Sequence, residues 1–363
     1  MKLGDLPTPS LVVDAGAFAR NLDTMAATRP GPSLRPHVKA HKCTSLAARQ
    51  VAMGHRTFTC ATPREVVGMI DAGVGTDVLL ANETLDRSRL HSMSEAQRRS
   101  GVTVIVAVDS AETIDAAASS GITDVLVDVN VGLPRCGCAQ DAAPVLARLA
   151  QSRGLVVRGV MGYEGHLMAL PDRESQRNKV LDSMTTLVDT FDEVVAALDH
   201  DPRCTIVSAG GTGTFDLYAT EHPVLSRVNE VQAGSYALMD THYGALDLPF
   251  EQALFVVGTL ISSTGDPGSP GSWSVIDVGL KSLGMDHGNP SIDGASVWFC
   301  SDEHTTLAFD DHTRPALGSK VLVRPAHVDP TVAMHDAMHL VDDVALGSDA
   351  SVLETWPVDL RGW

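Results

Sequence analysis

The stretch Ser33-Leu34-Arg35-Pro36-His37-Val38-Lys39-Ala40-His41-Lys42 places a lysine among basic residues, at the end of the first predicted β-strand, residues 33–37. A free lysine amine has a pKa near ~10.4, and neighbouring cations or burial can lower it until the amine condenses with a carbonyl group. Lys39 is therefore a candidate Schiff-base lysine. A solvated basic surface loop would have the same composition, so the interpretation depends on the rest of the chain.

Seven more short β-branched runs follow, separated by longer amphipathic segments. The eight predicted strands are residues 33–37, 57–60, 77–80, 102–108, 124–129, 155–161, 205–208 and 230–232. Helical periodicity between them is clearest at residues 64–72, 110–119, 139–153 and 174–198. Eight such units over roughly 200–250 residues predict an α/β fold of the (β/α)8 TIM-barrel type, with its chemistry at the carboxyl ends of the strands. A doubly wound open sheet is the alternative for this stretch.

The sequence changes character after about residue 250. Short alternating runs without helical spacers lie at residues 254–262, 273–277, 296–300, 320–325 and 338–341, and turn-rich segments separate them. These runs predict a C-terminal antiparallel β domain. We therefore expect residues 16–249 to form the barrel, and residues 1–15 together with 250–363 to form the β domain.

The composition disfavours several classes of function. The chain has 363 residues, of which 44% are hydrophobic and 20% charged, which suits one large domain or two ordinary ones. Its net charge of −18 would repel nucleic acid and anionic membrane surfaces. No stretch approaches the ~20 apolar residues that span a bilayer. Six scattered cysteines and an N-terminus without an apolar signal run favour a cytoplasmic location.

Polar residues gather in the loops that follow the predicted strands. Asp128, Asn130 and Arg135 follow the fifth strand, and Tyr163 and His166 follow the sixth. Because the carboxyl ends of the strands of a barrel meet at one face, these side chains should form a cluster there with Lys39.

The loop after the seventh strand contains Gly211-Thr212-Gly213, whose backbone N–H groups and hydroxyl suit a phosphate. It matches neither the nucleoside-triphosphate loop nor the dinucleotide motif, so ATP and NAD are not favoured. Ser235 and Tyr236 follow the eighth strand, and barrels commonly bind phosphate with the loops after strands seven and eight. A reactive lysine facing a phosphate site implies pyridoxal 5′-phosphate (PLP), although an ordinary glycine turn is the alternative.

A second kind of site is indicated near the C-terminus. In an extended chain, residues two apart point to the same side, so His327 and Asp329 can converge on one divalent cation. Most His-x-Asp pairs are ordinary surface pairs, so the motif is informative only together with the others.

Taken in order, these motifs resemble the metal-activated fold-type III PLP enzymes, which include D-threonine aldolase, D-serine dehydratase and 3-hydroxy-D-aspartate lyases. The matching segments run over nearly the whole chain: residues 35–42, 128–137, 162–166, 210–214, 234–236 and 327–331. The resemblance implies an alanine-racemase-like barrel that binds PLP, a β domain that carries the metal motif, and a homodimer with active sites near the subunit contact.

The resemblance also implies a role for each motif. Lys39 would bond to the cofactor, and Tyr163 would face it. Arg135 would lie beside its ring or phenolate oxygen. The phosphate would be held by Gly211, Thr212, Gly213, Ser235 and Tyr236. His166 would act as a catalytic base or simply pack, and both roles stay open because it follows the tyrosine more closely than the corresponding histidine of the aldolases does.

The metal motif points to one branch of these enzymes. Dehydratase relatives usually carry His-x-Cys with zinc, whereas aldolase relatives carry His-x-Asp with a harder ion. The carboxylate of Asp329 therefore favours Mn²⁺ beside His327, with Mg²⁺ or Zn²⁺ as alternatives. Asp286 and His287 lie in a family loop that would reach the site from the β domain or from a partner subunit.

The expected activity is PLP- and metal-dependent retro-aldol cleavage of a D-β-hydroxy-α-amino acid to glycine and an aldehyde. Dehydration of D-serine or 3-hydroxy-D-aspartate and amino-acid racemisation are alternatives on the same scaffold. A non-catalytic PLP carrier is a third alternative, against which the added β domain and the His-x-Asp motif argue.

Overall fold

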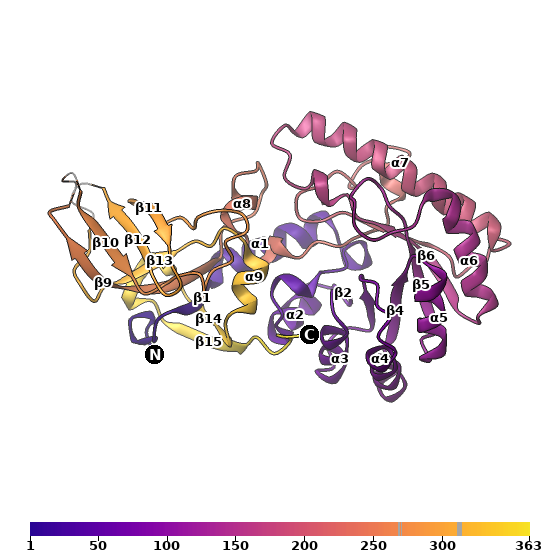
Figure 1. Ribbon diagram of the computed structural model, residues 1–363, viewed down its shortest axis with the longest axis horizontal. Helices are drawn as coiled ribbons and strands as arrows, with labels where there is room; N and C mark the ends of the chain where they lie inside the picture. The colour runs from indigo at the N-terminus through magenta and orange to yellow at the C-terminus, as the bar shows by residue number, and fades with distance from the viewer. Residues whose placement is uncertain (268, 270, 311–313) are drawn as a thin grey trace. The chain divides into compact units, whose positions relative to one another are not determined.

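The computed structural model describes residues 1–267, 269, 271–310 and 314–363 (Figure 1). The chain forms two compact units, described separately below. The barrel unit comprises Met25–Lys39, Ala47–Gly234 and Leu360–Trp363, and the β unit comprises Met1–Thr24, Ala40–Leu46 and Ser235–Asp359.

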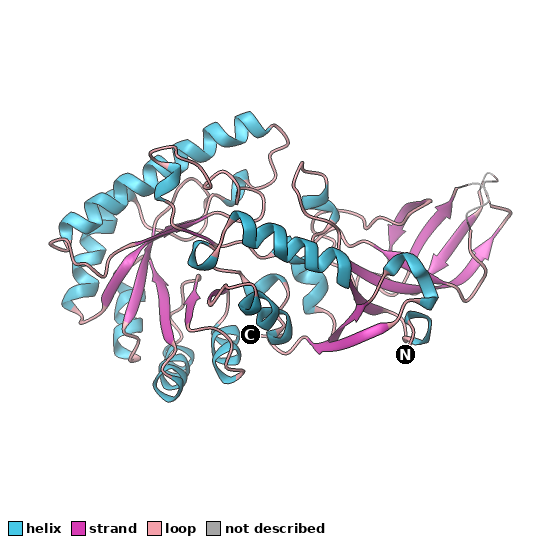
Figure 2. Ribbon diagram, turned by 180° about the vertical axis from the view of Figure 1, so that it is seen from behind, coloured by secondary structure: helices cyan, strands magenta, loops and turns pink. Residues whose placement is uncertain are grey.

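The barrel unit is built on a parallel sheet that, in the described residues, has seven strands in sequential order. The strands are β2 (Thr57–Cys60), β3 (Asp77–Leu80), β4 (Thr103–Val108), β5 (Asp124–Asp128), β6 (Val156–Gly162), β7 (Ile206–Ala209) and β8 (Glu230–Val231). The helices that alternate with them are α3 (Pro63–Asp71), α4 (Arg87–Ser100), α5 (Ala111–Ser119), α6 (Ala143–Ser152) and α7 (Arg173–Ala197). Figure 2 shows these helices on the outer side of the curved sheet.

Continuous apolar runs explain why these strands lie inside the unit. All but the first residue of β4, Thr103-Val104-Ile105-Val106-Ala107-Val108, is buried, as is typical of parallel strands covered on both faces. Side chains of four neighbouring strands form one apolar cluster: Leu79, Ile105, Ala107, Leu126 and Met161. Helix boundaries follow local signals, as in α3, where the N-cap residue Thr62 and Glu65 form a capping box and Pro63 is the first helical residue.

The predicted first strand occupies the eighth position of the ring without forming a regular strand. Leu34 forms a parallel bridge with Val231 of β8, and His37 forms one with Thr59 of β2. The His37 N–H donates to the Ala233 carbonyl at 3.0 Å, and the Thr59 N–H donates to that of Pro36 at 2.9 Å. Pro36 has no N–H to donate, which explains the interrupted ladder. The segment nevertheless lies between β8 and β2 and closes the ring.

A buried ion pair fastens this closing segment. The Arg35 guanidinium, which is 2% exposed, contacts Asp77 at 2.6 Å and Glu230 at 2.8 Å. Burial alone would lower the pKa of Arg35, but the two carboxylates outweigh burial and raise it. Asp77 and Glu230 are the first residues of β3 and β8, so the ion pairs of Arg35 lie at the amino ends of these strands. The charge of Arg35 is therefore compensated at the opposite end of the strands from the loops that carry the candidate site residues.

The β unit is built on an eight-stranded, largely antiparallel sheet within the described residues. Its strands are β1 (Ser10–Asp14), β9 (Leu254–Thr264), β10 (Trp273–Ile276), β11 (Ala295–Cys300), β12 (Thr305–Phe309), β13 (Lys320–Val323), β14 (Ala337–Val341) and β15 (Val352–Pro357). The order is β11-β12-β10-β9-β1-β14-β15, with β13 also paired to β9. The N-terminal strand β1 is antiparallel to β9 and parallel to β14, so it is an interior strand of this sheet.

The predicted fold class, a (β/α)8-type barrel followed by an antiparallel β domain, is confirmed. Strands β12 and β15 were not among the predicted runs. All six cysteines are free, and the cytoplasmic location stays a prediction. Among the residues described, we find no helix with the length and apolar character needed to cross a membrane.

Candidate active site

Lys39 lies where the closing segment of the barrel ends. The chain turns there into a short 3-10 helix, Val38–Ala40, and Lys39 is half-buried between the buried residues Val38 and Ala40. This is the carboxyl end of the segment that bridges β8 and β2, as expected for a barrel active-site residue.

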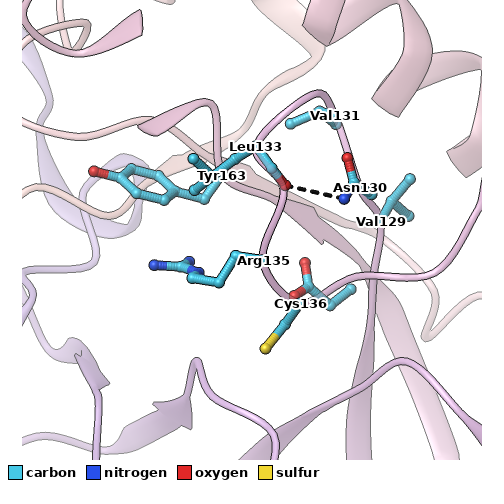
Figure 3. A pocket seen from close by; sticks show the side chains of 8 residues that line it. Val129, Asn130, Val131, Leu133, Arg135, Cys136 and Tyr163 are labelled. Carbon is cyan, nitrogen blue, oxygen red and sulfur yellow. Dashed lines mark hydrogen bonds between the residues drawn. The ribbon is translucent and has the colours of Figure 1, made fainter. Parts of the chain in front are cut away.

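A pocket opens at the carboxyl end of β5 (Figure 3). It is lined by Asp128, Val129, Asn130, Val131, Leu133, Arg135, Cys136 and Tyr163. The Arg135 guanidinium carbon lies 5.3 Å from the centre of the Tyr163 ring. The side chain of Asn130 holds the loop in shape, because its amide donates to the Leu133 carbonyl at 3.0 Å and its oxygen accepts from Gly132 N–H at 2.9 Å. The loop after β5 therefore brings a cation to the tyrosine that follows β6.

Acidic and thiol groups gather beside this pocket. Burial and the neighbouring carboxyl of Glu83 raise the pKa of Asp128 well above its usual range, although Arg135 acts in the opposite direction. A hydrogen bond to Glu83, together with burial, raises the pKa of the Cys136 thiol to about 12. Ligand atoms of Glu83, Asp109 and Cys136 lie within 4.8 Å of one another. Sequence reasoning missed Glu83 and Asp109, although each closely follows a predicted strand.

The imidazole of His166 lies against the loop that carries Arg135. A Cβ atom added at Gly132 would come within 3.0 Å of His166 Cε1. The side chain is exposed and belongs to the 3-10 turn Gly165–Leu167 that follows β6. His166 is thus placed among the same two loops as Arg135 and Tyr163, with its ring accessible.

A buried carboxylate shapes the predicted phosphate loop. Glu164, which is 0% exposed, accepts hydrogen bonds from Gly210 N–H at 3.1 Å, from the Thr214 hydroxyl at 2.8 Å and from the Tyr218 hydroxyl. Burial raises the pKa of Glu164, and these donors offset only part of that effect. Sequence reasoning gave Glu164 no role, since nothing in its motif shows that its partners lie 46 to 54 residues away.

Glycine is required in this loop for two reasons. Gly210 has a φ of +79°, in the left-handed region that other residues rarely adopt. A Cβ at Gly213 would collide with the carbonyl oxygen of Met168, in the segment that follows β6. Thr212 is buried, and a Cβ at Gly211 would come within 3.7 Å of the Tyr163 ring. The loop is therefore packed against the segment that carries Tyr163, which leaves no room for a side chain at Gly211 or Gly213.

The His-x-Asp motif lies in the β unit, at the start of α9 (Val328–Ala333). His327 is the N-cap residue, with φ −144° and ψ 123°, and Asp329 lies in the first helical turn. The prediction of an extended chain is therefore wrong beyond His327, because the helix begins at the next residue. The two side chains still converge, with His327 Nε2 and Asp329 Oδ2 3.7 Å apart.

Two further side chains contact His327, and a third stacks on one of them. Its Nδ1 lies 2.7 Å from Asp286 Oδ2, and the His287 ring meets its ring edge-on with centroids 4.3 Å apart. The His242 ring stacks on His287 at 4.1 Å. One ligand atom each from Asp286, His287 and His327 fall within 4.8 Å of one another. The structure thus places Asp286 and His287 beside the predicted ligands of the same chain.

The predicted phosphate binders after β8 also belong to the β unit. Ser235 Oγ lies 3.5 Å from Asp329 Oδ2. The Tyr236 ring is fully buried, with its centroid 5.7 Å from that of Phe250. The Tyr236 ring is thus part of the core, whereas Ser235 lies beside the metal motif.

The predicted site residues are therefore divided between the two units. The barrel unit carries the residues predicted to hold and face the cofactor in segments that follow its strands: Lys39, Arg135, Tyr163, His166, Gly211, Thr212 and Gly213. The β unit gathers Ser235, His327 and Asp329, and adds Asp286, His287 and His242.

Comparison with known proteins accounts for the whole chain. The family model described as the alanine racemase N-terminal domain matches residues 13–242, and a serine dehydratase domain model matches residues 253–341. The D-threonine aldolase of Arthrobacter sp is 32% identical, with 99% of this chain and 94% of that protein aligned.

Two solved structures show the same arrangement of the fold. The D-threonine aldolase from Filomicrobium marinum superposes with a TM-score of 0.88 at 35% identity, covering 100% of this chain and 98% of that one. A mutant D-threo-3-hydroxyaspartate dehydratase in its metal-free form has a TM-score of 0.85 at 26% identity, with both chains covered completely. The chain belongs to the alanine racemase-like family that includes D-threonine aldolases and D-serine dehydratases.

Proposed function

We propose that this protein is a PLP- and divalent-metal-dependent lyase that cleaves D-β-hydroxy-α-amino acids into glycine and an aldehyde. The observation that carries the proposal is the pair His327 Nε2 and Asp329 Oδ2, 3.7 Å apart, in a chain similar over its full length to D-threonine aldolases. An imidazole and a carboxylate with open positions between them suit a divalent ion that also takes substrate oxygens.

The barrel unit has donors that fit PLP. Lys39 supplies a half-buried amine, and the Gly211–Gly213 loop supplies backbone N–H groups where side chains are excluded by Met168. Arg135, 5.3 Å from the Tyr163 ring centre, supplies a positive charge for a phenolate. Bound PLP would supply an electron sink for the electrons released at the substrate's Cα.

The β unit has donors that fit a hard divalent ion. His327 would offer Nε2 and Asp329 a carboxylate oxygen, which together favour Mn²⁺, with Mg²⁺ or Zn²⁺ as alternatives. An ion held there would lower the pKa of a bound β-hydroxyl group and orient the Cα–Cβ bond.

Each residue would then have one task in the cleavage. Lys39 would be the residue that holds the cofactor before the substrate binds and after the product leaves. His166, whose ring is exposed beside Gly132, accepts the β-hydroxyl proton. The Cα–Cβ electron pair stays on Cα, which is protonated to give glycine, and Cβ leaves as the aldehyde. Arg135 and Tyr163 would lie beside the cofactor ring and keep it in position.

A dehydratase is the second candidate, because the similarity to the D-threo-3-hydroxyaspartate dehydratase also covers the whole chain. In that reaction Lys39 would take the proton from Cα, and the β-hydroxyl would leave as hydroxide with the help of the ion. The products would be a keto acid and ammonia.

One assay separates these reactions. The purified protein, supplied with PLP and Mn²⁺, is incubated with D-threonine and with D-serine, in the presence and absence of EDTA. We expect acetaldehyde and glycine from D-threonine, abolished by EDTA and restored by Mn²⁺. Keto acid and ammonia would instead identify a dehydratase, and metal-independent loss of optical rotation a racemase. If no D-β-hydroxyamino acid is converted, the proposal is wrong.

A spectroscopic test isolates the role of Lys39. The protein with PLP should have a visible absorption band that borohydride removes, and Lys39→Ala should lack both the band and turnover. Lys179→Ala, which removes an exposed lysine of α7 in the same unit, is the matched control and should keep both.

We also propose a homodimer, as the family resemblance implies. The β unit exposes large apolar side chains on strands β9, β10 and β11 of one sheet: Ile261, Trp273, Trp298 and Phe299. Exposed apolar groups of this size often mark subunit contacts. Light scattering coupled to gel filtration should give twice the mass of 38.4 kDa, and a monomer at micromolar concentration would contradict the proposal.

A further inference from the structure

We propose that Asp286 is a positioning residue for the metal site, which holds His327 in the tautomer and orientation that direct Nε2 toward the ion. The inference rests on the metal site of the proposed function and assigns a role to a residue outside the His-x-Asp motif. Ligand histidines in metalloproteins commonly donate their second ring N–H to a carboxylate in this way.

The distances assign different roles to the two carboxylates. Two bonds of about 2.1 Å from one ion keep its ligand atoms roughly 3 to 4 Å apart. His327 Nε2 and Asp329 Oδ2, at 3.7 Å, fall in that range. His327 Nδ1 and Asp286 Oδ2, at 2.7 Å, are too close for an ion between them and have the distance of a charge-assisted hydrogen bond. Asp286 therefore accepts the Nδ1 proton, and Nε2 is left with its lone pair.

The backbone delivers Asp286 to this position. Gly284 forms an antiparallel bridge with His327, and its N–H donates to the Thr331 hydroxyl at 2.9 Å. That hydroxyl in turn donates to the His327 carbonyl at 2.6 Å. A Cβ at Gly284 would collide with the Pro330 ring, so the loop lies directly against the first turn of α9. The loop and the metal motif are thus one local structure.

The neighbouring rings limit how His327 can turn. His287 packs edge-on against it, and His242 stacks on His287. The side chain of His327 is 23% exposed, whereas that of Asp286 is 55% exposed. Asp286 can therefore be replaced without leaving a buried cavity.

The test measures Mn²⁺ binding to the full-length protein, followed by the loss of the free-ion EPR signal. We expect Asp286→Ala to weaken Mn²⁺ binding by about 10- to 100-fold, the usual effect of removing such a partner. Asp286→Asn should lose less than about tenfold, since its amide oxygen can still accept from Nδ1–H. Asp302→Ala removes an exposed carboxylate of the same unit and should leave binding unchanged.

A second readout follows the histidine itself. In ¹⁵N-histidine-labelled metal-free protein, His327 should carry its proton on Nδ1, and Asp286→Ala should change that tautomer population, whereas Asp302→Ala should not. Circular dichroism and the PLP absorption band serve as checks that the variants are folded.

The inference is overturned if Asp286→Ala binds Mn²⁺ within twofold of the wild type. It is also overturned if Asn weakens binding as much as Ala, since the negative charge or direct ligation would then be what matters. A wild-type protein that binds no divalent ion would remove the proposed metal site itself, and the inference with it.

Discussion

The barrel unit and the β unit each use a carboxylate to hold a functional group, and the two carboxylates differ in burial. Glu164 is fully buried and accepts three hydrogen bonds from the loop residues around Gly210. The side chain of Asp286 is 55% exposed and accepts a hydrogen bond from His327 Nδ1. The first organises a loop that must keep one shape, and the second orients a single ring.

This difference predicts where the cost of losing each group appears. Buried donors in the barrel unit cannot bond to water when their acceptor is removed. Removing a buried acceptor therefore lowers the free energy of unfolding. At the exposed edge of the β unit, water can replace the lost partner, so the effect should be confined to ligand binding. The four predictions below test this contrast by measuring the free energy of unfolding in urea, without cofactor or metal.

The largest expected effect is at Arg35. Arg35→Met should lower the free energy of unfolding by about 3 to 5 kcal/mol, because it leaves Asp77 and Glu230 without their buried cation. Arg203→Met is the matched control, since the exposed Arg203 pairs with Asp201 two residues away, and it should leave the free energy of unfolding close to that of the wild type. Equal effects of the two substitutions would show that burial of an ion pair does not determine how much stability is lost when it is broken.

The next largest effect is at Glu164. Glu164→Ala should cost about 3 kcal/mol, because it leaves the Thr214 and Tyr218 hydroxyls and Gly210 N–H without their acceptor. It should also weaken PLP binding in a titration of the absorption band, and Glu164→Gln, which keeps one acceptor oxygen, should be intermediate. The control is Glu193→Ala, at an exposed position of α7. A Glu164→Ala variant with wild-type stability would contradict the role assigned to this network.

A pH dependence is expected at Asp128. Burial and Glu83 raise its pKa in the folded protein, whereas in the unfolded chain an aspartate titrates near ~3.9. Between these two values the folded state binds more protons than the unfolded state, so the contribution of Asp128 to stability falls as the pH rises. Asp128→Asn should therefore gain stability relative to the wild type as the pH rises from about 4 toward the raised pKa of Asp128. The free energy of unfolding of Glu193→Gln, plotted against pH, should run parallel to that of the wild type. A parallel curve for Asp128→Asn would refute the raised pKa of Asp128.

The smallest effect on stability is expected at Asp286. Asp286→Ala should change the free energy of unfolding by less than about 1 kcal/mol, as for other half-exposed ion pairs. The same variant is the one expected to lose metal affinity. A loss of stability as large as that of Glu164→Ala would remove the contrast between the two units.

The sequence was most informative where short-range patterns decide the structure. Buried parallel strands such as β4 are continuous apolar runs, so all seven regular barrel strands were predicted to within two residues at each end. Strands β12 and β15 were missed because their identity depends on pairing: β12 is short and threonine-rich, and β15 carries polar residues on a sheet edge. Residues 34–37 form an interrupted ladder because Pro36 has no N–H to donate. That effect was hard to predict, since it depends on whether a neighbouring strand offers a carbonyl at that position.

The candidate site was predictable to the extent that its residues lie in short motifs. Lys39, Arg135, Tyr163, His327 and Asp329 were all named from such motifs, whereas the partners that orient them come from distant segments. The family resemblance placed Asp286 in a loop that reaches the site, but it lies 41 residues from His327 and no pattern in the sequence paired the two side chains.

The order in which the strands of the β unit are synthesised affects how that unit can fold. The interior strand β1 is synthesised first, yet it pairs with β9 and β14, which end at Thr264 and Val341. At about 5–20 residues per second, β1 must wait on the order of tens of seconds for its partners. Its buried, apolar residues Leu11, Val12 and Val13 remain uncovered during that time. The nascent chain should therefore depend on chaperones for the β unit, and a ribosome-bound fragment ending before residue 254 should be prone to aggregation.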